Sequence, residues 1–393
     1  MSSRRNVGLT VAVNLGMAVL NAITGIFLAR LLGPQRRGEL AAVLLWGTSM
    51  GAVAALGVPN AVVFQVARAR EQAGRILASA AALNLLTSVL FTLVAWFVVP
   101  LALGQQDGST KELAQLFVLV IPIYVLAGAP ANALRGSGEF ARWNLLRPLV
   151  PVLWLVTVLL AEITGHLSVA ALTASYLASQ AVLLSAAVAV GAPKMAKPFR
   201  VELHRWGSML RFGLPGVLGT LPTMANLRLD QMLLAAFVSN DRLGLYVVAV
   251  AWASVQSPVL AAFGSVLFPR LAGEEDSVAR LELLGRGLRV AVLVALALGA
   301  VVLVATPVGV RVLFGRAYAG AVPAAAILVA AGAVLAVSGV LEEAWRGLGR
   351  PTEVLWAEVG GLVVTGLLLS LLLPSLGIIG AALASLGGYL ATT

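Results

Sequence analysis

Apolar runs of about 18 to 25 residues recur along the whole chain of 393 residues, and they constrain its fold more than any other feature. A run of that length crosses the ~30 Å hydrocarbon core of a bilayer as a helix. Only 11% of the residues are charged, whereas soluble domains carry roughly 25%. The sequence therefore predicts an all-α, polytopic membrane protein.

Turns rich in glycine and proline divide these runs into about twelve predicted helices. The longest linker, roughly residues 192–207, separates two sets of six. We therefore expect an N-terminal six-helix bundle over residues 1–200 and a C-terminal six-helix bundle over 201–393. The predicted helices cover residues 7–31, 39–65, 75–103, 113–134, 145–162, 168–191, 208–238, 243–269, 288–313, 320–345, 354–373 and 377–392.

The basic residues predict an orientation. The net charge is +10, from 27 Lys and Arg against 17 Asp and Glu. If the N-terminus lies inside, 19 of the basic residues fall in cytoplasmic loops and 7 in loops on the opposite side. This bias follows the positive-inside rule and favours an even number of spans with both termini inside. It also accounts for the positive charge without a nucleic-acid partner.

A short motif repeats between the predicted halves. Arg36-Arg37-Gly38 follows the first predicted helix, and Arg242-Leu243-Gly244 follows the seventh, 206 residues later. Since each predicted half has an even number of helices, the repeats share one orientation, as in transporters built from parallel halves.

The composition and motifs argue against most enzymes. The chain has no cysteine, and its two histidines lie in separate predicted loops, so we expect no metal site and no cofactor. Motifs for a P-loop, a nucleophile elbow or a zinc protease are absent. A membrane glycosyltransferase would need extramembrane bulk to position its substrates, and no loop exceeds about 20 residues. We therefore expect a transporter that an ion gradient, the membrane potential or downhill flow drives.

The first predicted helix carries polar residues at helical spacing. Thr10, Asn14, Asn21 and Thr24 lie on one face. Such a face suits a water-lined cavity, and it equally suits hydrogen bonds between neighbouring helices. The sequence leaves both interpretations open.

The seventh predicted helix carries charges within the membrane. Asn226 and Asp230 share a face, whereas Arg228 points nearly the opposite way, so the two charged residues do not form a simple ion pair along the helix. An ionised side chain near the bilayer centre costs at least ~2.5–3.5 kcal/mol, so each needs water or a partner. The alternative to a transport role is that Arg228 snorkels outward while Asp230 pairs with Arg30 or Arg242.

Two further places are polar. Glu342 and Glu343 end the tenth predicted helix, and Glu342 stands four residues before Arg346, which favours an interfacial ion pair over a relay. Gln256, two residues before Pro258, marks a polar, bent segment.

Short motifs in consistent order resemble the multidrug/oligosaccharidyl-lipid/polysaccharide exporter superfamily, and most closely its polysaccharide-biosynthesis, Wzx-like flippase branch. The resembling segments are Phe27–Gly38, Phe212–Pro215, Leu229–Asp230, Gly244–Tyr246, Leu267–Leu271, Leu313–Tyr318, Gly347–Arg350 and Gly377–Ala381.

The resemblance implies a V-shaped fold of two bundles, like that of the multidrug and toxin exporters, which works by alternating access. The implied cargo is a polyprenyl-pyrophosphate-linked oligosaccharide, flipped from the inner to the outer leaflet of a bacterial cytoplasmic membrane. Membrane lipids, H⁺ or Na⁺, and polysaccharide polymerases or glycosyltransferases are the implied partners. Arginine suits the pyrophosphate because guanidinium binds its oxygens bidentately.

From the residues and the resemblance together we assign two sets of site residues. The expected translocation cavity contains Asn14, Asn21, Thr24, Arg30, Asn226, Arg228, Asp230 and Gln256. Ion or proton coupling is assigned to Asp230, Glu342 and Glu343. Arg30 and Asp230 match positions typical of the family.

Two other cargo classes remain alternatives. A cation-coupled multidrug antiporter often has an acid in its first helix, where this chain has only Asn14 and Asn21. Lipid II flippases of the same superfamily usually have fourteen helices, against the twelve expected here.

Overall fold

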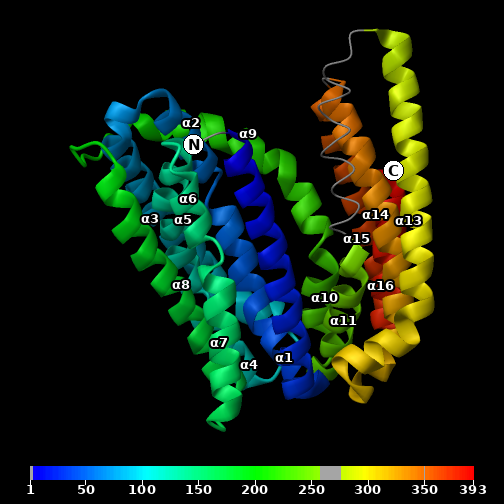
Figure 1. The fold of residues 1–393 in the computed structure, drawn as a ribbon. Helices are drawn as coiled ribbons and strands as arrows, with labels where there is room; N and C mark the ends of the chain where they lie inside the picture. Colours follow the sequence, from blue (N-terminus) through cyan, green and yellow to red (C-terminus); the bar gives the residue numbers. More distant parts are fainter. Residues whose placement is uncertain (1–2, 257–275, 349) are drawn as a thin grey trace. The chain divides into compact units, whose positions relative to one another are not determined.

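The computed structural model describes residues 3–256, 276–348 and 350–393, and within these ranges all regular structure is helical (Figure 1). Up to residue 194 the elements are α1 (Ser3–Ala54), α2 (Val58–Arg68), η1 (Arg70–Gln72), α3 (Ala73–Ala102), α4 (Gly108–Phe117), α5 (Val120–Gly136), α6 (Phe140–Leu146), α7 (Leu149–Ile163), α8 (Val169–Gly191) and η2 (Ala192–Lys194). They are followed by α9 (His204–Asn226), α10 (Leu229–Phe237), α11 (Asn240–Ala253), η3 (Ser254–Gln256), α13 (Ser277–Phe314), η4 (Arg316–Ala321), α14 (Val322–Gly347), α15 (Pro351–Leu376) and α16 (Ile378–Thr392).

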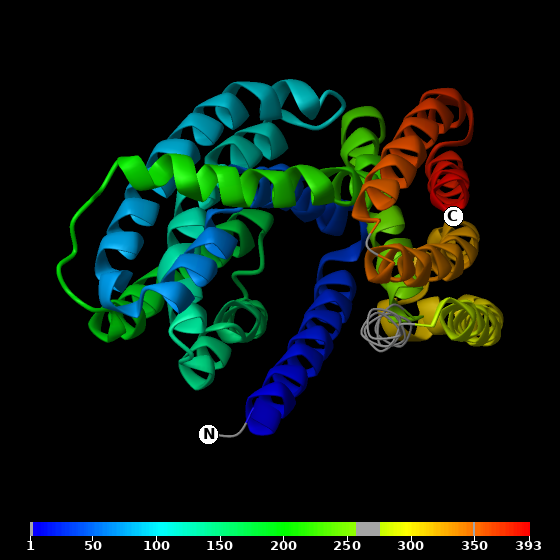
Figure 2. The same cartoon turned by 90° about the horizontal axis from the view of Figure 1, so that it is seen from above.

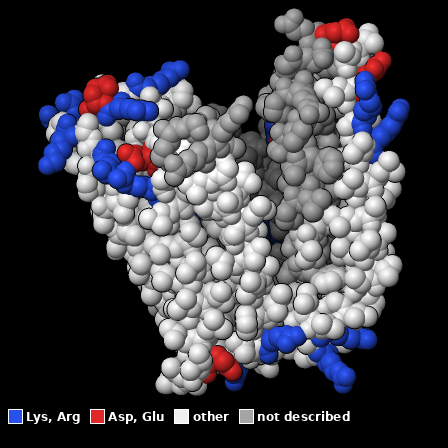
Figure 3. Space-filling view, in the orientation of Figure 1, with Lys and Arg blue, Asp and Glu red and all other residues white. Residues whose placement is uncertain are grey.

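Eight helical stretches of the described chain are long and apolar enough to cross a membrane. On the face drawn in Figure 3, charged side chains gather mainly at the ends of the helices, and a largely uncharged band lies between them. The chain is therefore a multi-pass membrane protein, as its apolar runs predicted. The number of twelve spans and the orientation of the termini stay predictions. The eight stretches are Gly8–Arg68, Arg70–Ala102, Gly108–Gly136, Phe140–Ile163, Val169–Lys194, Glu282–Phe314, Arg316–Arg346 and Thr352–Leu376.

The chain divides into two compact units. The first unit comprises residues 1–31 and 39–219, and the second comprises residues 32–38 and 220–393. The boundary between the two units thus falls inside α9, between Gly219 and Thr220. The division into two six-helix bundles at residue 200 stays a prediction.

The core of the first unit lies between α2, α3, α5 and the end of α8. Fully buried Val62, Ile76 and Leu134 are part of it, together with Met209 from the start of α9. Small residues permit the close approach of these helices: a Cβ on Gly136 would lie 2.8 Å from the carbonyl oxygen of Val63. Membrane helices use small residues in this way because lipid supplies no hydrophobic drive for their association.

The second unit is built around α13, α14, α15 and α16, and α15 and α16 have the most extensive contact (Figure 2). Gly361 and Gly388 face each other across that contact. A Cβ on Gly388 would lie 1.7 Å from Thr365 Oγ1, and one on Gly361 would lie 2.9 Å from the carbonyl oxygen of Gly388. Larger residues at either position would force the two helices apart.

The repeated Arg-containing motif meets its counterpart in the second unit. Gly33 has φ +69°, which only glycine adopts readily, and kinks α1 next to Pro34. Residues 32–38 then pack on the start of α11. A Cβ on Gly38 would lie 1.7 Å from the Asn240 carbonyl oxygen, and one on Gly244 would lie 1.9 Å from that of Pro34. Both repeat glycines are therefore required by direct backbone contact.

Several predicted helices are not single helices in the structure: 39–65 is interrupted between Ala54 and Val58, 113–134 between Phe117 and Val120, and 145–162 between Leu146 and Leu149. The predicted helix 208–238 is wrong as a single helix, because α9 ends at Asn226 and α10 begins at Leu229. The predicted helix 243–269 is described only as far as Gln256. Its second part lies outside the described residues, and so does the whole motif Leu267–Leu271.

Candidate transport site

The polar face of α1 meets a basic segment within the first unit. Arg147 Nη2 donates to Asn14 Oδ1 at 2.7 Å. Asn144 Nδ2 donates to Thr10 Oγ1 at 3.0 Å. The polar face predicted for the first helix therefore bonds α6 and the residue that follows it, and Asn14 itself remains exposed.

Two guanidinium groups lie over one indole ring beside this contact. The Cζ atoms of Arg135 and Arg147 are 5.2 Å and 4.6 Å from the centroid of the Trp143 ring. Among the described residues, neither arginine forms an ion pair with a carboxylate. Two like charges gathered without a counter-charge favour the binding of an anion. We call Asn14, Arg135, Trp143 and Arg147 the basic cluster.

The other first-helix candidates lie outside the basic cluster. Asn21 is exposed, whereas Thr24 is 3% exposed and donates to the Leu20 carbonyl at 2.8 Å. Arg30, near the Gly33 kink, is exposed. Thr24 thus satisfies its hydroxyl within its own helix. Roles for these three residues in the cavity stay predictions.

The break between α9 and α10 separates the charges that the sequence placed on one helix. Arg228 has φ −128° and stands as the N-cap of α10, with its side chain exposed. Asn226 and Asp230 are 2% and 3% exposed. Arg228 is thus exposed where Asn226 and Asp230 are buried, in agreement with the different face predicted for it.

Asp230 takes its hydrogen bonds from neutral groups. Oδ2 accepts from Tyr246 Oη at 2.5 Å and from Ser385 Oγ at 3.1 Å, and Oδ1 accepts from the Gln231 amide at 2.6 Å. Asp230 also lies in the first turn of α10, where the helix dipole favours an anion. Asp230 forms no ion pair with Arg242 among the described residues of the second unit, and the alternative pairing with Arg30 stays a prediction. The sequence reasoning did not identify Tyr246 of α11 and Ser385 of α16, whose hydroxyl groups donate hydrogen bonds to the buried carboxylate of Asp230.

Asn226 and Gln256 likewise bond within the second unit. Asn226 Oδ1 accepts from Thr365 Oγ1 of α15 at 2.7 Å. Gln256, fully buried, donates from Nε2 to the Val329 carbonyl of α14 at 2.8 Å. Both side chains link helices, and their roles in translocation stay predictions.

The end of α14 carries the acidic residues assigned to coupling. Arg346 Nη2 donates to Glu342 Oε2 at 2.8 Å, and Nη1 donates to Glu343 Oε1 at 2.6 Å. The expected ion pair between Glu342 and Arg346 is confirmed. Near Glu342, the sequence reasoning missed Glu358 of α15, which is 2% exposed. An acidic residue within an apolar span was the signal for it.

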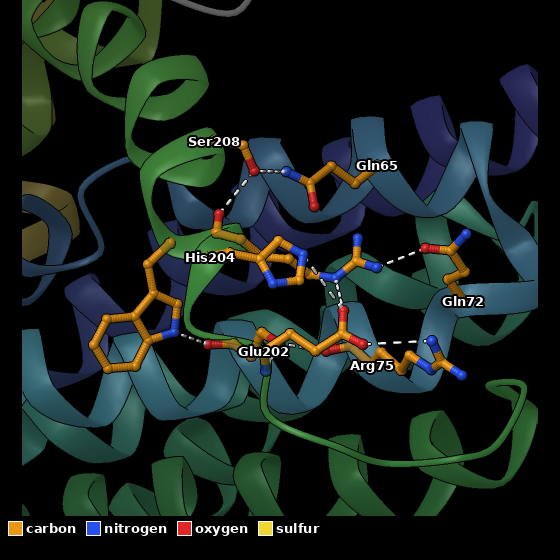
Figure 4. A network of polar contacts seen from close by, with 9 residues as sticks. Gln65, Gln72, Arg75, Glu202, His204 and Ser208 are labelled. Atoms are coloured by element: carbon orange, nitrogen blue, oxygen red, sulfur yellow. Dashed lines mark hydrogen bonds and ion pairs between the residues drawn. The ribbon is translucent and has the colours of Figure 1, made fainter.

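Glu202 holds the linker between η2 and α9 against α3 within the first unit (Figure 4). Glu202 accepts from Arg205 Nε at 2.5 Å and from Arg75 Nη1 at 3.4 Å. Its amide donates to Ser79 Oγ at 2.9 Å, and the Trp206 indole donates to the Ser79 carbonyl at 3.0 Å. The hydrogen bond from Arg205 holds the pKa of Glu202 below its ordinary value, and the charges of Arg205, Arg75 and His204 act in the same direction against desolvation.

Comparison with known families agrees with this architecture. The model of the family described as "Polysaccharide biosynthesis protein" matches residues 3–273. The chain belongs to this family. No curated protein matches the chain.

Solved transporters share the fold. An inward-facing multidrug resistance MATE family transporter of the MOP superfamily is 18% identical, with a TM-score of 0.78, over 96% of this chain and 92% of that one. The lipid II flippase MurJ in an inward closed conformation is 11% identical, with a TM-score of 0.81, over 98% and 86%. A MATE transporter in a bent conformation is 20% identical, with a TM-score of 0.62, over 98% and 92%. The family model thus confirms the expected polysaccharide-biosynthesis family, and these structures show that the chain has the fold expected from the resemblance.

Proposed function

We propose that the chain is a flippase that moves a polyprenyl-pyrophosphate-linked oligosaccharide from the inner to the outer leaflet by alternating access. The basic cluster carries this proposal. Two arginines over one indole, with no carboxylate paired to either among the described residues, fit a pyrophosphate, which offers oxygens for bidentate contact. The family of polysaccharide biosynthesis proteins supports a lipid-linked glycan as cargo.

The position of the cluster suits the loading of such a cargo. With the N-terminus inside, as the charge bias predicts, Arg135 and Arg147 lie at the cytoplasmic ends of their helices. Lipid-linked oligosaccharides that must be flipped outward are presented from that side. Asn14, which accepts from Arg147, places the arginine against the first helix. A bacterial cytoplasmic membrane, with a glycosyltransferase supplying the cargo, is the setting that this function requires.

The test is export in a bacterial strain that lacks its own flippase and carries this gene. Arg147→Ala should reduce surface polysaccharide about tenfold or more, because a charge-assisted hydrogen bond contributes about 1.5–3 kcal/mol. Arg147→Lys should retain part of the activity. Arg142→Ala is the matched control, since Arg142 lies in the neighbouring helix α6 and is paired with Glu139. Equal export in Arg147→Ala and wild type would refute the role of the cluster.

A cation-coupled multidrug antiporter is the second candidate, favoured by the buried carboxyl of Asp230 and by the MATE fold. Efflux of ethidium from vesicles that depends on Asp230 would support it. A lipid II cargo, favoured by the fold shared with MurJ, would show itself as export of peptidoglycan precursor rather than of surface polysaccharide.

A further inference from the structure

A carboxyl group without a complete set of partners is buried in the second unit. Glu358 is 2% exposed, and its Oε2 atom has no hydrogen-bond partner among the described residues. Glu342 of α14 and Thr223 and Asn226 of α9 are among the side chains that interact with this carboxyl. An ionised carboxylate in such a place is strongly disfavoured, because Glu358 is buried and forms no ion pair with a basic residue of the described ranges.

The neighbouring carboxyl decides which of the two is neutral. Glu342 already has a cationic partner, because Arg346 Nη2 lies 2.8 Å from its Oε2 atom, whereas Glu358 has no ion pair among the described residues. Two carboxylates in contact cannot both ionise without mutual repulsion. The proton therefore belongs on Glu358.

Glu358 and Glu342 together connect the buried interior of the second unit with the solvent-exposed end of α14. The side chain of Glu342 is 14% exposed, and that of Arg346 is 39% exposed. The buried Glu358 thus interacts directly with Glu342, a carboxyl group that is partly exposed to solvent. The arginine beside Glu342 disfavours a metal cation there.

Other titratable groups that face Glu358 come from the helices packed on α15. Tyr389 of α16 lies within electrostatic range of both Glu358 and Asp230. Asp230 of α10 is already supplied with three hydrogen-bond donors. Thr223 and Asn226 of α9 are neutral. Glu358 is thus the acid of this group whose bonding is incomplete.

We propose that Glu342 and Glu358 form a proton-binding site in the second unit, in which Glu358 carries the proton and Glu342 connects it to water. Release of this proton when the unit changes conformation would couple the carrier to a proton gradient. The coupling rests on the transport function proposed above, whereas the binding of the proton does not.

Infrared spectroscopy of the purified full-length chain in lipid tests the binding. The carbonyl stretch of a protonated carboxyl is separate from that of a carboxylate and shifts in D₂O. At neutral pH, Glu358→Gln should remove the signal of one protonated carboxyl from the wild-type spectrum. Glu353→Gln, on the exposed surface of the same helix, should leave that signal unchanged. The measurement needs no cargo. It therefore tests proton binding independently of the proposed flippase function, which the export assay tests.

Several outcomes would overturn the proposal. One is an unchanged protonated-carboxyl signal in a folded Glu358→Gln. Another is loss of the wild-type signal when sodium is added at constant pH, which would indicate a metal-cation site. If Glu358→Gln does not fold, Glu342→Gln serves instead. That variant should keep the band but move its titration by roughly one pH unit, because the adjacent charge is gone, and an unmoved titration would refute the pairing.

Discussion

Single residues in the second unit show how the chain tolerates a polar interior. Asp230 is buried with hydrogen bonds from Tyr246 and Ser385, which lie on two other helices. A carboxylate offers several acceptor positions, and these donors occupy them where water cannot. Asp230 therefore links α10, α11 and α16, whatever part it takes in transport.

Tyr246→Phe should destabilise the protein by about 1–3 kcal/mol, because it removes a donor from a buried acceptor without creating a cavity. Thermal unfolding in detergent, followed by size-exclusion chromatography, measures the loss. Tyr124→Phe is the control, because Tyr124 is 44% exposed. An equal loss in both variants would mean that the bond from Tyr246 contributes nothing specific.

At the scale of helices, the repeated glycines determine where residues 32–38 lie. Gly38 and Gly244 permit backbone contacts that no side chain could accommodate. The sequence showed the repeat, and the structure shows that its two copies touch. Gly33, with its positive φ, kinks α1 within this segment, which belongs to the second unit.

Gly244→Ala should lower stability by about 1–3 kcal/mol, the usual effect of overpacking, although alanine favours a helix elsewhere. Gly25→Ala is a matched control, since a Cβ there would meet no atom within 4 Å. Unfolding temperatures of the two purified variants make the comparison. A Gly244→Ala protein as stable as Gly25→Ala would contradict the contact.

The ion pairs of Glu202, in the linker before α9, predict that the stability of the protein depends on pH. Because the folded pKa of Glu202 is lowered, its stabilising contribution is complete above the unfolded value of about 4.3 and is lost as the pH falls through the lower folded value. Wild type should therefore unfold at a higher temperature than Glu202→Gln at pH 7, and the difference should shrink below about pH 4. Glu162→Gln, at an exposed position, should show no difference at either pH. A difference in unfolding temperature between wild type and Glu202→Gln that stays constant with pH would exclude titration of Glu202 as its cause.

For the whole molecule, the family and the fold are established, while the direction of insertion is a prediction from charge. The chain has no cysteine, so single introduced cysteines report their location without background. A membrane-impermeant thiol reagent should label His166→Cys in intact cells and Arg200→Cys only after lysis, since both positions are exposed and the basic loop is expected inside. The reverse pattern would invert the topology and the loading side of the basic cluster.

The sequence by itself predicted an all-helical, multi-pass membrane protein, many of the breaks between its helices and the polar face of the first helix, because hydropathy and turn chemistry act over a few neighbouring residues. Only the tertiary structure decided which polar groups meet. Arg147 reaches Asn14 across 133 positions, Thr365 reaches Asn226 across 139, and Ser385 reaches Asp230 across 155. Helical periodicity places a side chain on a face, but the partner of that face depends on how distant helices pack.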